Sequence, residues 1–231
     1  MDGNGRWASR RFMPRIAGHR AGVKSVQKAI DFCVENEIPV LSLFALSVEN
    51  VQSRPESEVQ FLISLLSEMM VKNLDRLHNN GICIRIIGDL SIFDSKVQAD
   101  IQQAQSVTKN NLGLVLVIAI NYSGRWDIFQ AAKQFAQYAI DHHHHPAELT
   151  EKELSQFLCL HDLPEPDLLI RTSGEQRISN FMLWQFAYTE LFFIDEFWPD
   201  FDEAIFEKII AAFQKRERRF GKIEATKHAV L

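Results

Sequence analysis

The start of the chain carries side chains suited to binding a phosphorylated ligand. Gly3 and Gly5 let backbone N–H groups approach phosphate oxygens closely. Arg6 and Arg15 supply forked, charge-assisted donors, and His19 adds another donor. The types and the spacing of these residues therefore predict a diphosphate-binding site.

Asp2 is the exception among these donors. A carboxylate beside a phosphate is repulsive unless a cation lies between the two groups. A hard, oxygen-binding ion satisfies both, and Mg²⁺ is the simplest choice. The alternative interpretation is a glycine turn with solvated arginines. That alternative accounts for each residue separately but gives no reason for their clustering.

A second group of the same kind lies in RTSGEQRISN, residues 171–180. Arg171 and Arg177 follow a predicted strand, with Ser173, Gly174 and Ser179 close by in the sequence. Such an array suits phosphate oxygens, although an arginine pair in surface salt bridges is the simpler alternative. Two clusters at one sheet edge predict two phosphorylated substrates, or one substrate with two ends.

The segment GNGRWA, residues 3–8, also fits the loose dinucleotide fingerprint G-x-G-x-x-G/A. That interpretation lacks its structural context. No predicted strand stands before the motif, Pro14 interrupts the helix that should follow, and Glu49 is farther away than the usual acid. A nicotinamide or flavin enzyme is therefore the weaker alternative.

Five short segments are predicted strands, because they are rich in Val, Ile, Leu or Phe and end in polar residues or glycine. They are residues 38–46, 82–88, 112–120, 167–171 and 190–194. Helical patterns lie between them, most clearly over residues 22–36. The sequence therefore predicts an α/β fold with an open, mostly parallel central β-sheet flanked by helices. The polar segments after the strands then meet at the edge where such sheets bind ligands.

The composition is that of an ordinary globular protein. The chain has 231 residues, of which 46% are hydrophobic and 24% charged, and this predicts a single domain over residues 1–231. The net charge of −5 argues against a nucleic-acid partner, which normally leaves a basic footprint. The longest apolar run, residues 112–120, is far shorter than the roughly 20 residues of a membrane-spanning helix.

Cysteines and histidines bear on the cellular setting and on metal binding. Cys33, Cys83 and Cys159 are odd in number and widely separated, which favours reduced thiols in a cytosolic protein. The run DHHHHP, residues 141–146, indicates a solvated loop. Consecutive histidines cannot all face one ion in a regular element, and transition-metal binding stays the alternative.

Several motifs together resemble one enzyme family. They are MDGNGRWA at residues 1–8, GH at 18–19, SVENVQSRP at 47–55, NYSGRWD at 121–127, RTSGEQRISNFMLWQ at 171–185 and WPDFDEA at 198–204. In this order they resemble the cis-prenyltransferases, in particular the bacterial undecaprenyl diphosphate synthases, up to RERRFG at 216–221. Trans-prenyltransferases use DDxxD segments on all-α folds, and the sequence contains no such segment.

The resemblance implies an enzyme that adds isopentenyl diphosphate repeatedly to farnesyl diphosphate, with Mg²⁺ as cofactor and cis double bonds in the product. The growing polyprenyl diphosphate would lie in a hydrophobic tunnel and would serve as precursor of the lipid carrier used in cell-wall polysaccharide synthesis. The resemblance also implies a homodimer in the cytoplasm. Because a very long prenyl product must end in the bilayer, we also expect transient contact with the inner face of the membrane.

Motif positions carry the family's residue roles over to this chain. The resemblance implies that Asp2 and Asn50 are catalytic, that Asp2 and Glu190 hold the metal, and that Leu114 is the tunnel floor. The implied substrate-binding residues are Gly3, Asn4, Gly5, Arg6, Trp7, Arg15, His19, Ser47, Val48, Glu49, Val51, Arg54, Arg171, Arg177, Ile178 and Ser179. A helical stripe is either a tunnel wall or plain core, and its members are Phe61, Leu62, Leu65 and Met69.

The sequence departs from the family pattern at two places. The family has a hydrophobic strand before the DGNGR motif, and we expect the natural protein to carry one. The loop after residues 38–46 has Leu46 and Val51 in place of aromatic residues and one extra residue before Arg54, which leaves loop closure and the role of Arg54 open. Non-catalytic partner subunits of the family have typically lost the acid and the arginines of the first motif, which are present here.

Overall fold

The structure is a computed structural model that describes residues 1–216. In chain order its elements are α1 (Asn4–Ser9), α2 (Arg15–Glu35), β1 (Val40–Ser47), α3 (Val48–Ser53), α4 (Glu56–Asn79), β2 (Cys83–Ile87), η1 (Leu90–Ile92), α5 (Ser95–Thr108), β3 (Val115–Tyr122), α6 (Gly124–Asp141), η2 (Pro146–Glu148), α7 (Glu151–Ser155), β4 (Leu168–Arg171), β5 (Glu190–Phe193), η3 (Trp198–Asp200) and α8 (Glu203–Gln214). Of the RERRFG segment, only Arg216 falls within the described residues.

All five predicted strands are present, and every strand pair is parallel. β1, β3 and β2 form one sheet in that order, and β4 and β5 form a second sheet. The parallel α/β class is thus confirmed, but the strands lie in two sheets and not in the single sheet that we expected. Within residues 1–216, β1 and β4 each have a strand partner on one edge alone.

The carboxyl ends of the first sheet coincide, as predicted. Ser47, the last residue of β1, is in register with Tyr122, the last residue of β3. Beyond β2, the side-chain amide of Asn121 donates to the carbonyl of Asp89 at 2.7 Å. The polar segments that follow these strands therefore emerge at one edge.

Helix α2 begins at Arg15, directly after Pro14, and is longer than the predicted helix over residues 22–36. Proline is well suited to precede a helix, because it has no backbone N–H to leave unpaired. Gly18 lies inside α2 because α1 packs against it there. A Cβ atom at Gly18 would stand 1.9 Å from the carbonyl oxygen of Asn4.

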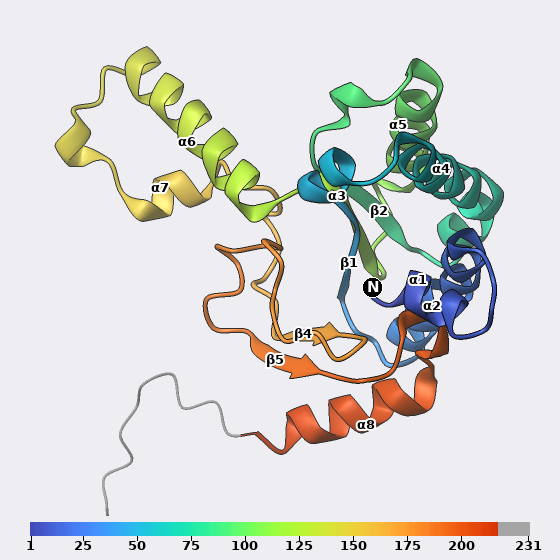
Figure 1. The fold of residues 1–231 in the computed structure, drawn as a ribbon. Coiled ribbons are helices and arrows are strands. Elements are labelled where there is room, and N and C mark those ends of the chain that lie inside the picture. Colours follow the sequence, from blue (N-terminus) through green and yellow to red (C-terminus); the bar gives the residue numbers. More distant parts are fainter. Residues whose placement is uncertain (217–231) are drawn as a thin grey trace, which may run out of the picture.

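The core lies on both faces of β3, because alternate side chains of a strand point to opposite faces. Leu116 and Ile118 belong to a large apolar cluster to which α2, α4, α5 and α8 also contribute. Val117 belongs to a second cluster with Phe181 and Met182. In Figure 1, α4 and α5 lie beside β2, whereas α6 and α7 extend away from the sheets.

The remaining sequence-based expectations concern cysteines, histidines and membrane spans. Cys33, Cys83 and Cys159 are free thiols, as predicted. The predicted loop is confirmed, because residues 142–145 lie between the end of α6 and the start of η2. In residues 1–216, no three His, Cys, Asp or Glu side chains gather as they would around a metal ion. Across the same residues, no helix combines the length and the apolar character needed to cross a membrane.

Candidate active site

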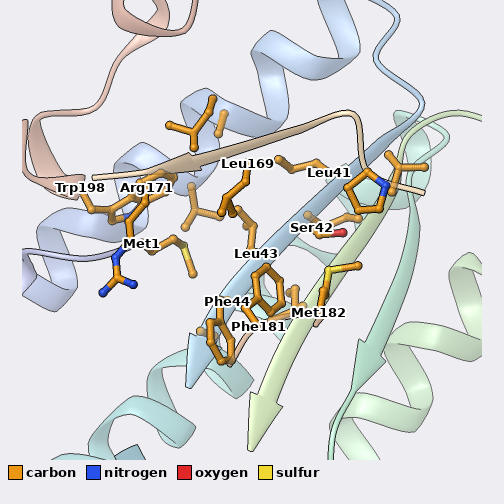
Figure 2. A pocket seen from close by; sticks show the side chains of 18 of the residues that line it. Met1, Leu41, Ser42, Leu43, Phe44, Leu169, Arg171, Phe181, Met182 and Trp198 are labelled. Carbon is orange, nitrogen blue, oxygen red and sulfur yellow. The ribbon is translucent and has the colours of Figure 1, made fainter. Parts of the chain in front are cut away.

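A cavity of about 1120 Å³ lies between the facing edges of β1 and β4. Every residue of both strands lines it. Figure 2 shows Met1 and Arg171 toward one end and Leu41 and Ser42 toward the other. The cavity therefore has a polar end, where the first and second motifs meet, and a long apolar body.

Both predicted phosphate-binding clusters open into this one cavity. The predicted catalytic and substrate-binding residues that line it are Asp2, Gly3, Asn4, Gly5, Arg6, Arg15, His19, Ser47, Asn50, Arg54, Arg171, Arg177, Ile178 and Ser179. These residues come from α1 and the residues before it, from α2, from β1, from α3 and the residue after it, and from the end of β4 and the segment that follows. Parts of the chain about 170 positions apart, such as Asp2 and Arg171, are thus brought into contact.

Asp2 is held in place by the second motif. One of its carboxylate oxygens accepts a hydrogen bond from Arg171 at 3.0 Å, and the other accepts one from the backbone N–H of Gly3 at 2.7 Å. The Thr172 hydroxyl donates to the Asp2 carbonyl at 2.8 Å. Burial opposes ionisation of Asp2, but the Arg171 hydrogen bond, the Gly3 N–H and the charges of Arg171 and Arg6 outweigh it and lower its pKa. The carboxylate is therefore ionised and fixed in orientation at neutral pH.

Gly3 is required by its backbone geometry. Its φ of +96° lies in the left-handed region that side chains disfavour. A Cβ atom at this position would also stand 2.5 Å from a ring carbon of Phe197 and 2.9 Å from the Cβ of Ser173. The turn that places Asp2 beside Arg171 is therefore compatible with glycine alone.

One carboxylate oxygen of Glu58 lies close to Arg15 and His19 of the first motif and to Arg54. Arg15 lies 3.3 Å and Arg54 3.2 Å from this oxygen, and the Nε2 atom of His19 lies 3.5 Å away. Burial, together with the charge of Arg54, lowers the pKa of His19 despite the nearby Glu58. The Nε2 atom is buried and makes no hydrogen bond within the described residues, with the Glu58 oxygen 3.5 Å away.

Glu175 lies within the second motif and pairs with two arginines. Its carboxylate lies 3.0 Å from Arg6 and 2.5 Å from Arg177. Arg6 also donates to the Ser173 hydroxyl at 2.6 Å. The sequence motifs indicated no role for Glu58 or Glu175. The position of Glu58 four residues after Arg54, and of Glu175 two residues before Arg177, were the local signals available.

Arg54 reaches the site despite the extra residue in its loop. Its guanidinium donates to the side-chain oxygen of Asn50 at 3.3 Å and to Glu58 at 3.2 Å. Asn50 in turn donates its backbone N–H to the Ser47 hydroxyl at 3.1 Å, which caps α3. Arg54 therefore joins α3 to the start of α4.

Four predicted substrate-binding residues do not line the cavity: Trp7, Val48, Glu49 and Val51. The Trp7 indole donates to Asp200 at 2.7 Å. Val51 packs against the large core cluster. Glu49 accepts a hydrogen bond from Asn180 at 2.7 Å. Leu114 also lies outside the lining and is buried in the large core cluster. Of the helical stripe, Leu62, Leu65 and Met69 line the cavity, whereas Phe61 lies beneath Arg20.

The structure does not bring Glu190 to Asp2. Glu190 begins β5 in register with Leu168, three residues of strand before Arg171, which is roughly 10 Å along β4. Its carboxylate is paired with Arg216. Within the described residues Glu190 thus lies beside the other end of β4 from Arg171, and its role as a metal ligand stays a prediction.

Asp2 fits a magnesium site in which the protein supplies a single carboxylate ligand. Mg²⁺ is commonly held by one or two carboxylates, with substrate phosphates and water completing its shell. One carboxylate at the polar end of the cavity, among arginines, matches that donor set. Transition-metal ligands do not accompany Asp2, since residues 1–216 contain no cluster of three such side chains.

Residues 4–8 of the GNGRWA segment lie in α1, a helix of six residues, and the next helix, α2, begins only after Pro14. A dinucleotide fold would instead place a long helix directly after a glycine loop. The fold and the cavity thus define an α/β protein with two sets of cations at the mouth of an apolar cavity. Such a site suits a phosphorylated, apolar substrate.

Comparison with known proteins agrees with this class. Residues 1–221 match the prenyltransferase family model described as "Putative undecaprenyl diphosphate synthase". The chain belongs to this family.

The chain is also similar to individual proteins of this kind, in sequence and in structure. The chain is 55% identical over 222 residues to the farnesyl-diphosphate-specific ditrans,polycis-undecaprenyl-diphosphate synthase of Coxiella burnetii, covering 96% of this chain and 93% of that protein. Its structure is similar to lavandulyl diphosphate synthase of Lavandula x intermedia in complex with dimethylallyl diphosphate, with a TM-score of 0.90, 33% identity and coverage of 96% and 95%. It is also similar to a probable undecaprenyl diphosphate synthase of Campylobacter jejuni, with a TM-score of 0.76, 38% identity and coverage of 88% and 93%.

Proposed function

We propose that this protein is an undecaprenyl diphosphate synthase, a cis-prenyltransferase that adds isopentenyl diphosphate units to farnesyl diphosphate. The observation that supports it most is the cavity, whose polar end holds both cationic motifs and whose body is apolar. A substrate with a diphosphate head and an isoprenoid tail has the same division. The names of relatives at about half identity over nearly the whole chain point to the same reaction.

The first motif is proposed to hold the diphosphate of the allylic substrate. Arg6, Arg15 and His19 line the cavity there, and Arg15 and His19 share the carboxylate of Glu58. As the allylic C–O bond stretches, negative charge builds on the departing diphosphate. Donors that are already oriented stabilise this charge without reorganisation, and in many enzymes such stabilisation accounts for most of the rate enhancement.

The second motif is proposed to hold isopentenyl diphosphate. Arg171, Arg177 and Ser179 line the same cavity, and Arg171 donates to the Ser179 hydroxyl at 2.7 Å. Asn50 lies at the cavity wall, bonded to Arg54, and is proposed to orient the group that accepts the proton lost after condensation. A bound Mg²⁺ would supply Lewis-acid stabilisation of the departing diphosphate, with Asp2 as its protein ligand.

The apolar body of the cavity is proposed to receive the growing chain. Leu62, Leu65 and Met69 of α4 form part of its wall. Several expectations stay predictions. They are the continuous product tunnel, Leu114 as its floor, the role of Glu190, the preceding strand and the single domain over residues 1–231. Homodimerisation, a cytoplasmic location and transient contact with the membrane also stay predictions.

A non-catalytic partner subunit is the second candidate within the family. The presence of Asp2, Arg6, His19, Arg171 and Arg177 in one cavity favours the enzyme. The test is to incubate the protein with farnesyl diphosphate, radiolabelled isopentenyl diphosphate and Mg²⁺ and to resolve the products by length. We expect a long polyprenyl diphosphate. A folded protein that forms no product would point to the partner subunit.

A further inference from the structure

Asn180 makes three hydrogen bonds that leave its own segment. Its backbone carbonyl accepts the N–H of Gly124 at 2.6 Å, and its side-chain oxygen accepts the N–H of Arg125 at 3.0 Å. Its side-chain amide donates to Glu49 at 2.7 Å. An amide side chain can accept and donate at the same time, so asparagine suits a position between the backbone N–H of Arg125 and the carboxylate of Glu49.

These hydrogen bonds join three elements that carry or support the candidate active site. Gly124 and Arg125 begin α6, which follows β3 directly. Glu49 lies on α3 beside Asn50, and Asn180 follows Ser179 in the chain. Since Asn50 and Ser179 both line the cavity, the Asn180–Glu49 hydrogen bond links the walls that carry them.

The segment around Asn180 needs such support because several of its residues have energetically unfavourable backbone conformations. Ser179, Asn180 and Met182 have φ values of 50°, 60° and 41°, in the left-handed region. Asparagine tolerates this region better than most residues, whereas serine and methionine do not favour it. A strained backbone persists where surrounding contacts determine it, and the contacts of Asn180 with α6 and α3 are of that kind.

We propose that Asn180 is a positioning residue, which sets the distance between Ser179 and Asn50 by bonding Glu49 and the start of α6. The proposal rests on the proposed function, in which Ser179 binds isopentenyl diphosphate and Asn50 acts in the same condensation. Asn180 is given no contact with substrate. Glu49, which motif position assigned to substrate binding, becomes the partner of Asn180 instead.

The test is an exchange of the two partners. Asn180→Asp keeps the shape of the side chain but places a second carboxylate against Glu49. We expect kcat/KM for isopentenyl diphosphate to fall about 10- to 100-fold, because a displacement near 1 Å has effects of this size. Adding Glu49→Gln restores a donor and an acceptor to the pair, and we expect it to recover most of this loss.

Several controls make the result interpretable. Asn110→Asp, at an exposed position just beyond α5, introduces the same charge change away from the site and is expected to leave activity unchanged. Melting temperatures show whether each variant folds. If Asn180→Asp does not fold, Glu49→Ala removes the same hydrogen bond from the α3 side and is expected to give the same loss in kcat/KM.

The outcomes separate this inference from the proposed function. Absence of elongation by the unmodified protein counts against the proposed function. In that case calorimetry compares the pyrophosphate affinity of the unmodified protein, Asn180→Asp and the double variant, which tests the role of Asn180 without any catalysis. Weaker binding in Asn180→Asp that recovers in the double variant supports the inference. An active unmodified protein whose Asn180→Asp variant is equally active, or is not improved by Glu49→Gln, overturns the inference alone.

Discussion

Arg171 donates one hydrogen bond to Asp2 at 3.0 Å and another to Ser179 at 2.7 Å. The guanidinium at the end of β4 thus connects the first motif to the second. A planar fork with several fixed donors is needed to serve both partners at once. The two phosphate-binding clusters that the sequence indicates separately are therefore parts of one site.

We predict that Arg171→Lys lowers kcat/KM for isopentenyl diphosphate about 100-fold. An ammonium group cannot reach Asp2 and Ser179 together in the orientation of the fork. Steady-state kinetics with each diphosphate varied in turn measures the effect. Arg177→Lys, in the same proposed binding site, is expected to lose less activity, because the Arg177 side chain is 62% exposed and its ion pair is with Glu175. Equal activity of Arg171→Lys and the unmodified protein would contradict the bridging role.

We predict that Glu58→Gln destabilises the protein at pH 7 and destabilises it less at pH 3. Burial opposes ionisation of Glu58, but Arg15, Arg54 and His19 outweigh it and lower the pKa of the carboxyl. The stabilisation is therefore fully present above the unfolded-state pKa of about 4.3 and is lost as pH falls through the folded-state pKa.

Thermal unfolding across this pH range measures the effect of Glu58→Gln. We expect the melting temperature to fall by about 2–4 °C at pH 7, which corresponds to about 1 kcal/mol for a chain of this size. Glu56→Gln is the matched control, since Glu56 is exposed on the same first turn of α4. A difference of the same size at pH 7 and pH 3 would rule out the proposed charge interaction.

We predict that Leu65→Trp shortens the product by one or more isoprene units. Leu65 lines the apolar body of the cavity, and a larger side chain removes volume that the growing chain would occupy. Chromatography of the radiolabelled products gives their lengths. Phe61→Trp, on the same helix but outside the lining, is expected to leave the length unchanged. The account fails on this point if both variants give products of the same length.

The strands and the ends that carry polar residues were predictable from local patterns. The apolar runs of β1, β2 and β3 end in Ser47, Gly88 and Asn121, and these short-range signals place the polar segments at one sheet edge. The division into two sheets was not predictable in this way. It depends on which strand edges pair, and the composition of β4 does not encode that.

The arginines and Asp2 were also predictable, because phosphate chemistry requires these residue types. Their carboxylate partners were predictable only where they are close in sequence, as Glu58 is to Arg54. Glu58 lies 43 residues from Arg15, and nothing local indicates that the two side chains meet. Asn180 was hidden for the same reason, since its partner Glu49 is 131 residues away. Glu190, whose metal role rests on motif position alone, stays a prediction: it begins β5 in register with Leu168, and its carboxylate pairs with Arg216.

The central claim is that Asp2 supports Mg²⁺-dependent elongation at the polar end of the cavity. The most direct measurement compares the unmodified protein with Asp2→Ala, using farnesyl diphosphate and radiolabelled isopentenyl diphosphate, with Mg²⁺ and with a chelator. We predict a long polyprenyl product from the unmodified protein in Mg²⁺, and none from Asp2→Ala or after chelation. Elongation by a folded Asp2→Ala variant at the unmodified rate, or by the unmodified protein in chelator, would contradict the claim.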